Sequence, residues 1–360
     1  MNPDPEFVGN KLRGVRRLVR WFVRFLVGLA ALALLLVLAA LAYQAIASAR
    51  DARRYPPPGK LVDVGNLRLH IHSTGEGGPT VILDSGWSDC SLNWYLVQPE
   101  VARFTRVCAY DRAGTGWSEV GPSPRSSRQI VRELHALLQN AGIPGPYVLV
   151  GHSFGGYNVR LFAYEYPKEV AGLVLVDSAV EDQWPLLPES VKRGYAAMQQ
   201  QLEAGRPLSK FGIIRRFYLR PNPKLPGAVQ ATDLALRART PYLDTICKEW
   251  EGIAHESADQ VRVATPLPPV PLVVLTAGQH GDQPPPGISM EDFDRWNALL
   301  REKQANLVKL SPDSMQIIVT NSTHVMQLDQ PQVVVEAIRK VVMAARGKML
   351  LESFDQRLVD

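Results

Sequence analysis

The longest hydrophobic segment of the chain, residues 25–49, lies near the N-terminus and contains no charged side chain. Its 25 residues exceed the roughly 20 apolar residues that a helix needs to cross a bilayer. A cleavable signal peptide has a shorter apolar region of about 7–15 residues, although Ala47-Ser48-Ala49 resembles a cleavage site. The length favours an uncleaved transmembrane anchor, and the near absence of a polar face disfavours a buried core helix.

Basic residues flank this segment unevenly. Six Lys and Arg precede it within residues 1–24, and four follow it within residues 50–60. The positive-inside rule therefore predicts that residues 1–24 are cytoplasmic and that the rest of the chain lies on the outer, periplasmic or extracellular side. Residues 50–60 contain three consecutive prolines and are predicted to form a short, stiff linker.

Beyond residue 60, short β-branched runs alternate with segments of helical periodicity. Residues 61–72 are expected to form an opening hairpin that turns at Gly65-Asn66. Repeated strand–helix units predict an α/β domain over residues 61–347, with a mostly parallel central sheet and helices on both faces, followed by a tail at 348–360. The predicted strands are residues 80–84, 105–111, 147–150, 171–177, 270–275 and 316–320, and the predicted helices are 127–141, 154–166 and 332–345.

Residues 179–268 interrupt this alternation. They contain helical stretches separated by Pro and Gly, and they are too long for a simple crossover connection. We therefore expect a helical cap inserted into the sheet domain. Its aromatic residues either line the roof of a pocket or pack between cap and sheet. They are Phe211, Phe217, Tyr218, Tyr242 and Trp250.

The overall charge is basic, with 40 Lys and Arg against 35 Asp and Glu. Residues 1–60 alone contain ten basic and three acidic side chains, so the remainder of the chain is close to neutral. This distribution argues against nucleic-acid binding by the main domain. The three cysteines, Cys90, Cys108 and Cys247, are too few for a disulfide framework.

The candidate chemistry lies in Gly151-His152-Ser153-Phe154-Gly155, between a predicted strand and a predicted helix. In this context Gly-x-Ser-x-Gly is typical of a nucleophile elbow, in which Gly151 and Gly155 permit a sharp turn that projects the serine hydroxyl. The helix N-terminus also places the Phe154 backbone N–H to stabilise an oxyanion. The alternative is that Ser153 only caps the helix.

A nucleophilic serine needs a base and an acid, which on this scaffold follow it in the order acid, then histidine. His324 follows the last predicted strand and precedes the final helix, so it is predicted to be the base. Two aspartates remain open as the acid. Asp282 follows the strand at 270–275 and is placed first, and Asp177, at the end of the strand at 171–177, is an almost equal alternative.

Over residues 61–347 these motifs resemble the α/β-hydrolase superfamily. Ser85-Gly86-Trp87 stands in place of the His-Gly loop of that family, so the resemblance implies the Trp87 backbone N–H as the second oxyanion donor. Residues 110–118 resemble the family's Asp-Arg-x-Gly-x-Gly-x-Ser turn, which is structural there. A serine at the elbow disfavours the dehalogenase and epoxide hydrolase branches. The resemblance is strongest to lid-bearing bacterial enzymes that include monoacylglycerol lipase-like esterases and proline iminopeptidase-like enzymes.

The sequence therefore predicts a membrane-anchored serine hydrolase that cleaves carboxylic esters, lipid-derived ones among the options, through an acyl-enzyme. It predicts no metal or organic cofactor, since phosphate-loop and dinucleotide motifs are absent from the sequence. An Asn321-Ser322-Thr323 sequon next to the predicted base favours a bacterial envelope protein, because a glycan there would crowd the site. The oligomeric state stays open, since the apolar segment has no Gly-x-x-x-Gly.

Two alternatives remain. A non-catalytic receptor or scaffold could use the same fold. A proline iminopeptidase-like aminopeptidase would need cap carboxylates to bind a substrate amine. The available ones are Glu203, Asp233, Asp244, Glu249, Glu251, Glu256 and Asp259.

Overall fold

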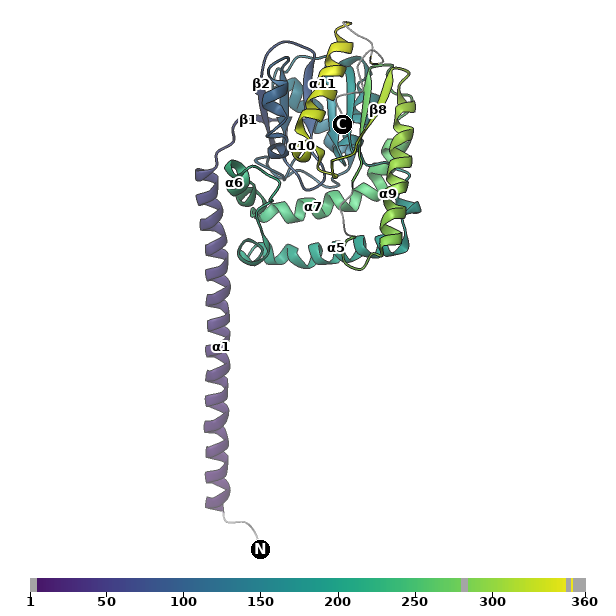
Figure 1. Cartoon of the computed structure of the whole chain (residues 1–360). Coiled ribbons are helices and arrows are strands. Elements are labelled where there is room, and N and C mark those ends of the chain that lie inside the picture. The colour runs from purple at the N-terminus through teal and green to yellow at the C-terminus, as the bar shows by residue number, and fades with distance from the viewer. Residues whose placement is uncertain (1–4, 280–283, 348–350, 352–360) are drawn as a thin grey trace.

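The computed structural model describes residues 5–279, 284–347 and 351 of the chain. It begins with a long helix, α1 (Pro5–Arg54), which extends away from all other elements (Figure 1). From Arg16 to Arg54 this helix is long and apolar enough to cross a membrane, and its most apolar part is not buried against the protein. Its side chains, such as Leu35 at 63% exposure, would face water unless lipid or another protein covered them.

Helix α1 continues beyond the predicted span and ends at Arg54, just before Tyr55 and three prolines. Proline disfavours helical geometry in the residue that precedes it, which explains why the helix ends here. The next element, β1, starts at Lys60. Within the predicted linker, therefore, only residues 55–59 are outside regular structure.

In the described part of the chain, one eight-stranded sheet forms the centre of the domain, in the order β1-β2-β4-β3-β5-β6-β7-β8. The pairs β1–β2 and β2–β4 are antiparallel, and all other neighbours are parallel. The predicted α/β class with a mostly parallel sheet is thus confirmed. The strands are β1 (Lys60–Asp63), β2 (Arg68–Thr74), β3 (Thr80–Asp84), β4 (Val107–Tyr110), β5 (Tyr147–His152), β6 (Val170–Val176), β7 (Leu272–Ala277) and β8 (Ser314–Val319).

Helices cover both faces of this sheet. Alternate residues of a strand are therefore buried on opposite sides, each against different helices. In β5, Leu149 packs into one core with α3 (Ser127–Asn140), α4 (Gly155–Glu165) and α8 (Ala258–Arg262). Its neighbours Val148 and Val150 pack into a second core with α2 (Gln98–Val101) and α11 (Pro331–Ala345). A strand buried on both faces is nearly continuous in apolar residues, which is the pattern of this segment in the sequence.

The predicted cap is present between β6 and β7 and forms a separate layer along one side of the domain (Figure 1). A further helix, α9 (Met290–Ala305), follows β7 and packs against the cap helix α5, so the cap layer is built from two segments of the chain. The cap elements are η3 (Trp184–Leu186), α5 (Glu189–Ser209), η4 (Ile214–Tyr218), α6 (Gly227–Arg237), α7 (Thr240–Gly252) and η5 (Ile253–Ser257).

Candidate active site

Ser153 occupies a sharp turn between β5 and α4. Its φ of 52° lies in the left-handed region, which residues other than glycine adopt rarely. The Ser153 backbone N–H donates to the carbonyl of Val176 at 3.1 Å, and its carbonyl accepts from the Ala179 N–H at 3.0 Å. The neighbouring strand β6 and the loop after it therefore hold the turn in this strained conformation.

Three glycines around Ser153 allow α4 to approach the sheet closely. A Cβ at Gly151 would lie 2.5 Å from the carbonyl oxygen of Gly155, and a Cβ at Gly155 would lie 2.5 Å from that of Asp84. A Cβ at Gly156 would lie 1.9 Å from the Ser178 hydroxyl. These separations are too short for any side chain, so the spacing of the glycines reflects packing around the turn.

His324 lies between β8 and the short helix α10 (Met326–Asp329). Its Nδ1 is 2.6 Å from Oδ2 of Asp177, which follows directly after β6. A neutral His324 with its proton on Nδ1 donates this bond and leaves Nε2 as a proton acceptor. His324 and Ser153 line the same cavity, so the structure brings together a serine, a histidine and a carboxylate from three separate loops.

The Asp177 carboxylate is buried and firmly held. Its Oδ1 accepts hydrogen bonds from the Ala277 backbone N–H at 3.0 Å and from the Gln304 side chain at 3.1 Å. Gln304, on α9, also donates to the carbonyl of Ser178. These bonds fix the carboxylate so that Oδ2 faces the imidazole, which is the arrangement that orients a catalytic histidine.

Asp177 also determines the proton affinity of His324. Desolvation by itself would lower the pKa of His324, but the hydrogen bond and the negative charge of Asp177 outweigh it and raise the pKa above its usual 6.5. The side chain of His324 remains 50% exposed, so its ring can contact a bound molecule.

Asp177, one of the two aspartates predicted as the acid, is bonded to His324 in the part of the chain that the structure describes. Asp282, which the sequence analysis placed first, lies outside the described residues.

His152, which precedes Ser153, is buried at the end of β5. Its Nε2 donates to the backbone carbonyl of His324 at 2.8 Å, while its Nδ1 lies 3.3 Å from the side-chain amide of Gln327. Burial, together with the nearby His324, lowers the pKa of His152 to about 3. His152 therefore stays neutral and positions the main chain of His324, a role that the sequence analysis did not identify.

The two predicted oxyanion donors border the cavity. Among the described residues, no hydrogen bond uses the backbone N–H of Phe154 or of Trp87. The Trp87 indole instead donates to the carbonyl of Ile246 on α7 at 2.8 Å, which fixes its side chain against the cap. Both backbone donors are thus available to a bound oxygen atom.

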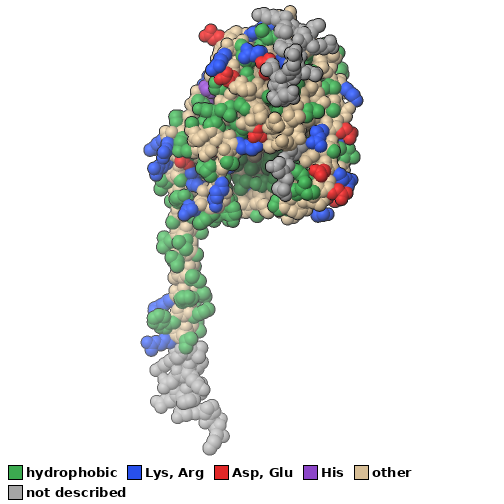
Figure 2. Space-filling model, viewed as in Figure 1, with side chains coloured by type: hydrophobic (Ala, Val, Ile, Leu, Met, Phe, Trp, Pro, Cys, Tyr) green, Lys and Arg blue, Asp and Glu red, His purple; other side chains and the backbone are tan. Residues whose placement is uncertain are grey.

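A cavity of about 330 Å³ extends from Ser153 and His324 between the sheet and the cap. Figure 2 shows a hollow in the surface between the sheet and the cap layer, with hydrophobic side chains inside it. The rings of Trp184 and Tyr195 lie 5.9 and 5.1 Å from that of Trp250, so the aromatic wall is continuous. The aromatic lining consists of Trp87, Phe154, Trp184, Tyr195, Trp250, Phe293 and Trp296.

A family model described as "Alpha/beta hydrolase family" matches residues 69–337, most of the chain. The chain belongs to the alpha/beta hydrolase family. Among solved structures, an esterase from Thermogutta terrifontis superposes with a TM-score of 0.56 at 22% identity, covering 79% of this chain and 98% of that one. A putative ancestral haloalkane dehalogenase gives a TM-score of 0.60 at 16% identity, covering 80% and 99%. At these identities the likeness concerns the hydrolase fold alone.

Curated relatives match over shorter stretches. A probable transporter, efuK, of Hormonema carpetanum is 30% identical over 39% of this chain and 21% of its own length. The 2-hydroxymuconate semialdehyde hydrolase of Pseudomonas sp. (strain CF600) is 33% identical over 34% of this chain and 44% of its own length. An uncharacterized vacuolar membrane protein of Saccharomyces cerevisiae is 32% identical over 29% and 17%. The chain thus spans half or less of the length of these relatives.

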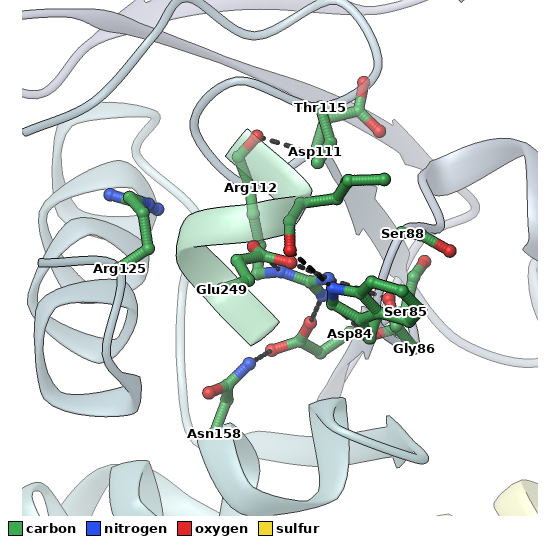
Figure 3. Close-up of polar contacts among 12 residues, drawn as sticks. Asp84, Ser85, Gly86, Ser88, Asp111, Arg112, Thr115, Arg125, Asn158 and Glu249 are labelled. Carbon is green, nitrogen blue, oxygen red and sulfur yellow. Dashed lines mark hydrogen bonds and ion pairs between the residues drawn. The ribbon is translucent and has the colours of Figure 1, made fainter. Parts of the chain in front are cut away.

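In this alpha/beta hydrolase, one buried arginine fixes the loop that carries Trp87 (Figure 3). Arg112 donates to the carboxylate of Asp84 at 2.8 Å and to the carbonyls of Ser85 and Gly86 at 2.6 and 2.7 Å. On its other side it pairs at 2.8 Å with Glu249 of the cap helix α7. Arg112 therefore connects the sheet, the Trp87 loop and the cap at one point, in agreement with the structural role implied for residues 110–118.

Of the five cap aromatics singled out in the sequence, Trp250 lines the cavity. Tyr242 of α7 is buried beside Trp87, Phe211 is partly buried, and Phe217 and Tyr218 are exposed. Sequence reasoning missed the lining residues on α9 and the Trp184 and Tyr195 side chains. The apolar spacing of Phe293, Trp296 and Leu300 on α9 follows a helical period and is a signal that could have identified this wall.

We expect Gly155→Ala to lower the thermal unfolding midpoint, measured by circular dichroism on the purified full chain. The new methyl group would meet the Asp84 backbone at 2.5 Å, and overpacking of this kind costs about 1–3 kcal/mol. Gly227→Ala is the matched control, because nothing lies within 4 Å of a Cβ at that position. Equal midpoints for the two variants would contradict the close-packing explanation.

We expect Arg112→Leu to reduce the free energy of unfolding by about 3–5 kcal/mol, because it leaves two buried carboxylates without their cation. Arg103→Leu serves as the control, since Arg103 is 73% exposed in its pair with Glu100 and should contribute at most about 1 kcal/mol. Chemical denaturation measures the free energy of unfolding of both variants and of the unchanged protein. A loss at Arg112 no larger than that at Arg103 would show that the buried cluster does not hold the cap.

Proposed function

We propose that this alpha/beta hydrolase is a membrane-anchored serine hydrolase that cleaves carboxylic esters through a Ser153 acyl-enzyme. The observation that carries the proposal is the bond between His324 Nδ1 and Asp177 at the edge of the cavity that Ser153 also lines. That arrangement supplies a nucleophile, a base and an orienting acid, which together define the triad chemistry.

In the first half-reaction His324 Nε2 removes the Ser153 hydroxyl proton as the serine oxygen attacks the ester carbonyl. The backbone N–H groups of Phe154 and Trp87 stabilise the negative oxygen of the tetrahedral intermediate. His324 then gives its proton to the leaving alcohol, and an ester of Ser153 remains. Water, deprotonated by His324, attacks this ester and releases the carboxylic acid with Ser153 restored.

We assign the acid role to Asp177 in preference to Asp282. Asp177 is buried, it already accepts a bond from His324, and its second oxygen is held by Ala277 and Gln304. A carboxylate held in this way stabilises the imidazolium that forms during attack without itself taking the proton.

An ester substrate agrees with the cavity better than a peptide amine does. Among the described lining residues the only carboxylate is Asp177, and it is bonded to His324. Of the cap carboxylates considered for binding an amine, Asp233, Asp244 and Glu249 pair instead with arginines. The aromatic wall suits an apolar acyl chain, so lipid-derived esters are the substrates we favour.

The membrane location is part of this proposal. Helix α1 supplies an exposed apolar surface long enough to span a bilayer, and the basic residues that precede it favour a cytoplasmic N-terminus. The catalytic domain would then lie on the outer side of a bacterial membrane.

We expect Ser153→Ala to reduce kcat/KM for p-nitrophenyl esters by on the order of 10⁴-fold or more, because it removes the nucleophile. The full chain is assayed in detergent over a series from short to long acyl chains, and labelling by a fluorophosphonate is followed in parallel. Ser73→Ala, at an exposed position on β2, is the control for loss of a hydroxyl. Retained turnover or labelling in Ser153→Ala would contradict the serine mechanism.

The rate should fall as the pH drops through the pKa of His324, which lies above 6.5, since a protonated imidazole cannot accept the serine proton. Asp177→Asn removes the charge that raises this pKa. We therefore expect the acidic limb of kcat/KM to move to lower pH, together with a loss in kcat of on the order of 10⁴-fold.

Asp282→Asn is the matched comparison for this experiment. A larger loss in Asp282→Asn than in Asp177→Asn, or an unmoved acidic limb in Asp177→Asn, would contradict the assignment of Asp177.

A further inference from the structure

Polar contacts dock the C-terminal part of α1 onto the cap. Gln44 is 3% exposed, and its Nε2 donates to the carbonyl of Ala238 at 2.9 Å and to the Thr240 hydroxyl at 3.2 Å. Arg215 of η4 donates to Gln44 Oε1 at 3.0 Å and pairs with Asp51, about two turns further along α1. Buried polar groups of this kind fix one orientation of α1 relative to the cap, because any other orientation would leave these groups without hydrogen-bond partners.

These contacts also place the cap relative to the span. A hydrocarbon core of about 30 Å corresponds to about 20 helical residues. If the core begins at Phe25, which follows the last arginine of the N-terminal segment, these 20 residues end at Gln44. Tyr43, at the same level, lies against Gly212, where a Cβ would be 2.7 Å from its ring. Gly212, where the segment 212–220 begins, therefore lies at the level where the apolar core of a membrane ends.

The side chains of this segment match that position. Phe217 and Tyr218 are 60% and 67% exposed, although large aromatic residues are usually covered. Arg216 and Arg220 flank them and are exposed as well. Neither arginine forms an ion pair with a carboxylate anywhere in the described part of the chain, and the Arg216 guanidinium lies 5.3 Å from the centre of the Phe217 ring.

The arrangement in Figure 1 agrees with this placement, because α1 extends from the side of the domain that the cap helices form. Aromatic rings and basic groups together are the composition of a bilayer interface, where rings lie at headgroup level and cations bind lipid phosphates. A protein partner would have to bind at this level beside α1, within the headgroup region.

We propose that residues 216–220 form an interfacial contact in which Phe217 and Tyr218 insert at the headgroup boundary while Arg216 and Arg220 bind the phosphates of anionic phospholipids. The inference rests on the proposed membrane anchoring of α1. Its consequence is that the cap over the cavity is held against the bilayer at two points, α1 and this contact.

Site-directed spin labelling of the full chain tests the proposal. The native Cys90, Cys108 and Cys247 are buried, so a thiol-reactive nitroxide will attach selectively to a new cysteine at an exposed position. Tyr218→Cys reports on the contact, Leu35→Cys on the middle of α1, and Ile318→Cys, 50% exposed on the edge strand β8, is the matched control. The proteins are reconstituted in vesicles of phosphatidylcholine with phosphatidylglycerol, and collisions with oxygen and with a water-soluble nickel chelate are measured.

We expect the ratio of oxygen to nickel collisions at Tyr218→Cys to lie between the high value of Leu35→Cys and the low value of Ile318→Cys. A ratio at Tyr218→Cys equal to that at Ile318→Cys, with Leu35→Cys in hydrocarbon, overturns the interfacial contact and leaves the anchor intact. Low ratios at all three positions instead overturn the membrane anchoring itself. A Tyr218→Cys label protected from both reagents would indicate a protein partner and would also overturn the proposal.

The role of the arginines is tested in the same labelled background. Arg216→Gln with Arg220→Gln should shift the equilibrium of the segment toward water by about fivefold for each arginine in anionic vesicles. In vesicles of phosphatidylcholine alone the same pair of substitutions should have little effect. An equal response in the two lipids would overturn the proposed recognition of anionic phosphate.

Discussion

The positions of the sheet, the Trp87 loop and the cap relative to one another depend on the neutralisation of one buried cation, Arg112. Arg112 is enclosed by Asp84 from the sheet and Glu249 from the cap, and the remaining donors of its guanidinium bind two carbonyls of the loop that carries Trp87. Tyr110 and Asn158 donate to the second oxygen of Asp84, so strand, loop, helix and cap meet in one network. Because a buried charge tolerates little displacement from its partners, this network sets the distance between the cap and the sheet edge.

The residues of the proposed triad are arranged on that frame by backbone constraints. Ser153 and Asp177 both have positive φ, and each stands directly after a parallel strand. Strain at these two residues is retained because the surrounding strands, the glycines of the turn and the Gln304 side chain leave no alternative geometry. The histidine, in contrast, is partly exposed and is held through the main chain by His152 and through its ring by Asp177.

Much of this could be predicted from local patterns in the sequence. The apolar runs located most of the strands along the chain, and the glycine spacing around Ser153 located the turn, because both signals lie in contiguous residues. The acid could not be chosen in this way, since Asp177 and Asp282 each come after a predicted strand. The bond between Asp177 and His324 depends on the three-dimensional arrangement, and Asp282 lies outside the described residues. Helix α9 was missed because its place in the cap layer depends on packing against the distant helix α5. Gln304 was missed because its partners Asp177 and Ser178 are far from it in the sequence.

The short connection between α1 and β1 has a kinetic consequence. The five residues 55–59 span at most about 18 Å when fully extended, and the contacts of Gln44 and Arg215 prevent even that extension. With α1 in a bilayer, the hydrolase-fold domain cannot leave the surface, and for the proposed activity its encounters with a lipid-dissolved substrate become a two-dimensional search. The rate would then follow the mole fraction of substrate in the membrane, not its concentration in the surrounding solution.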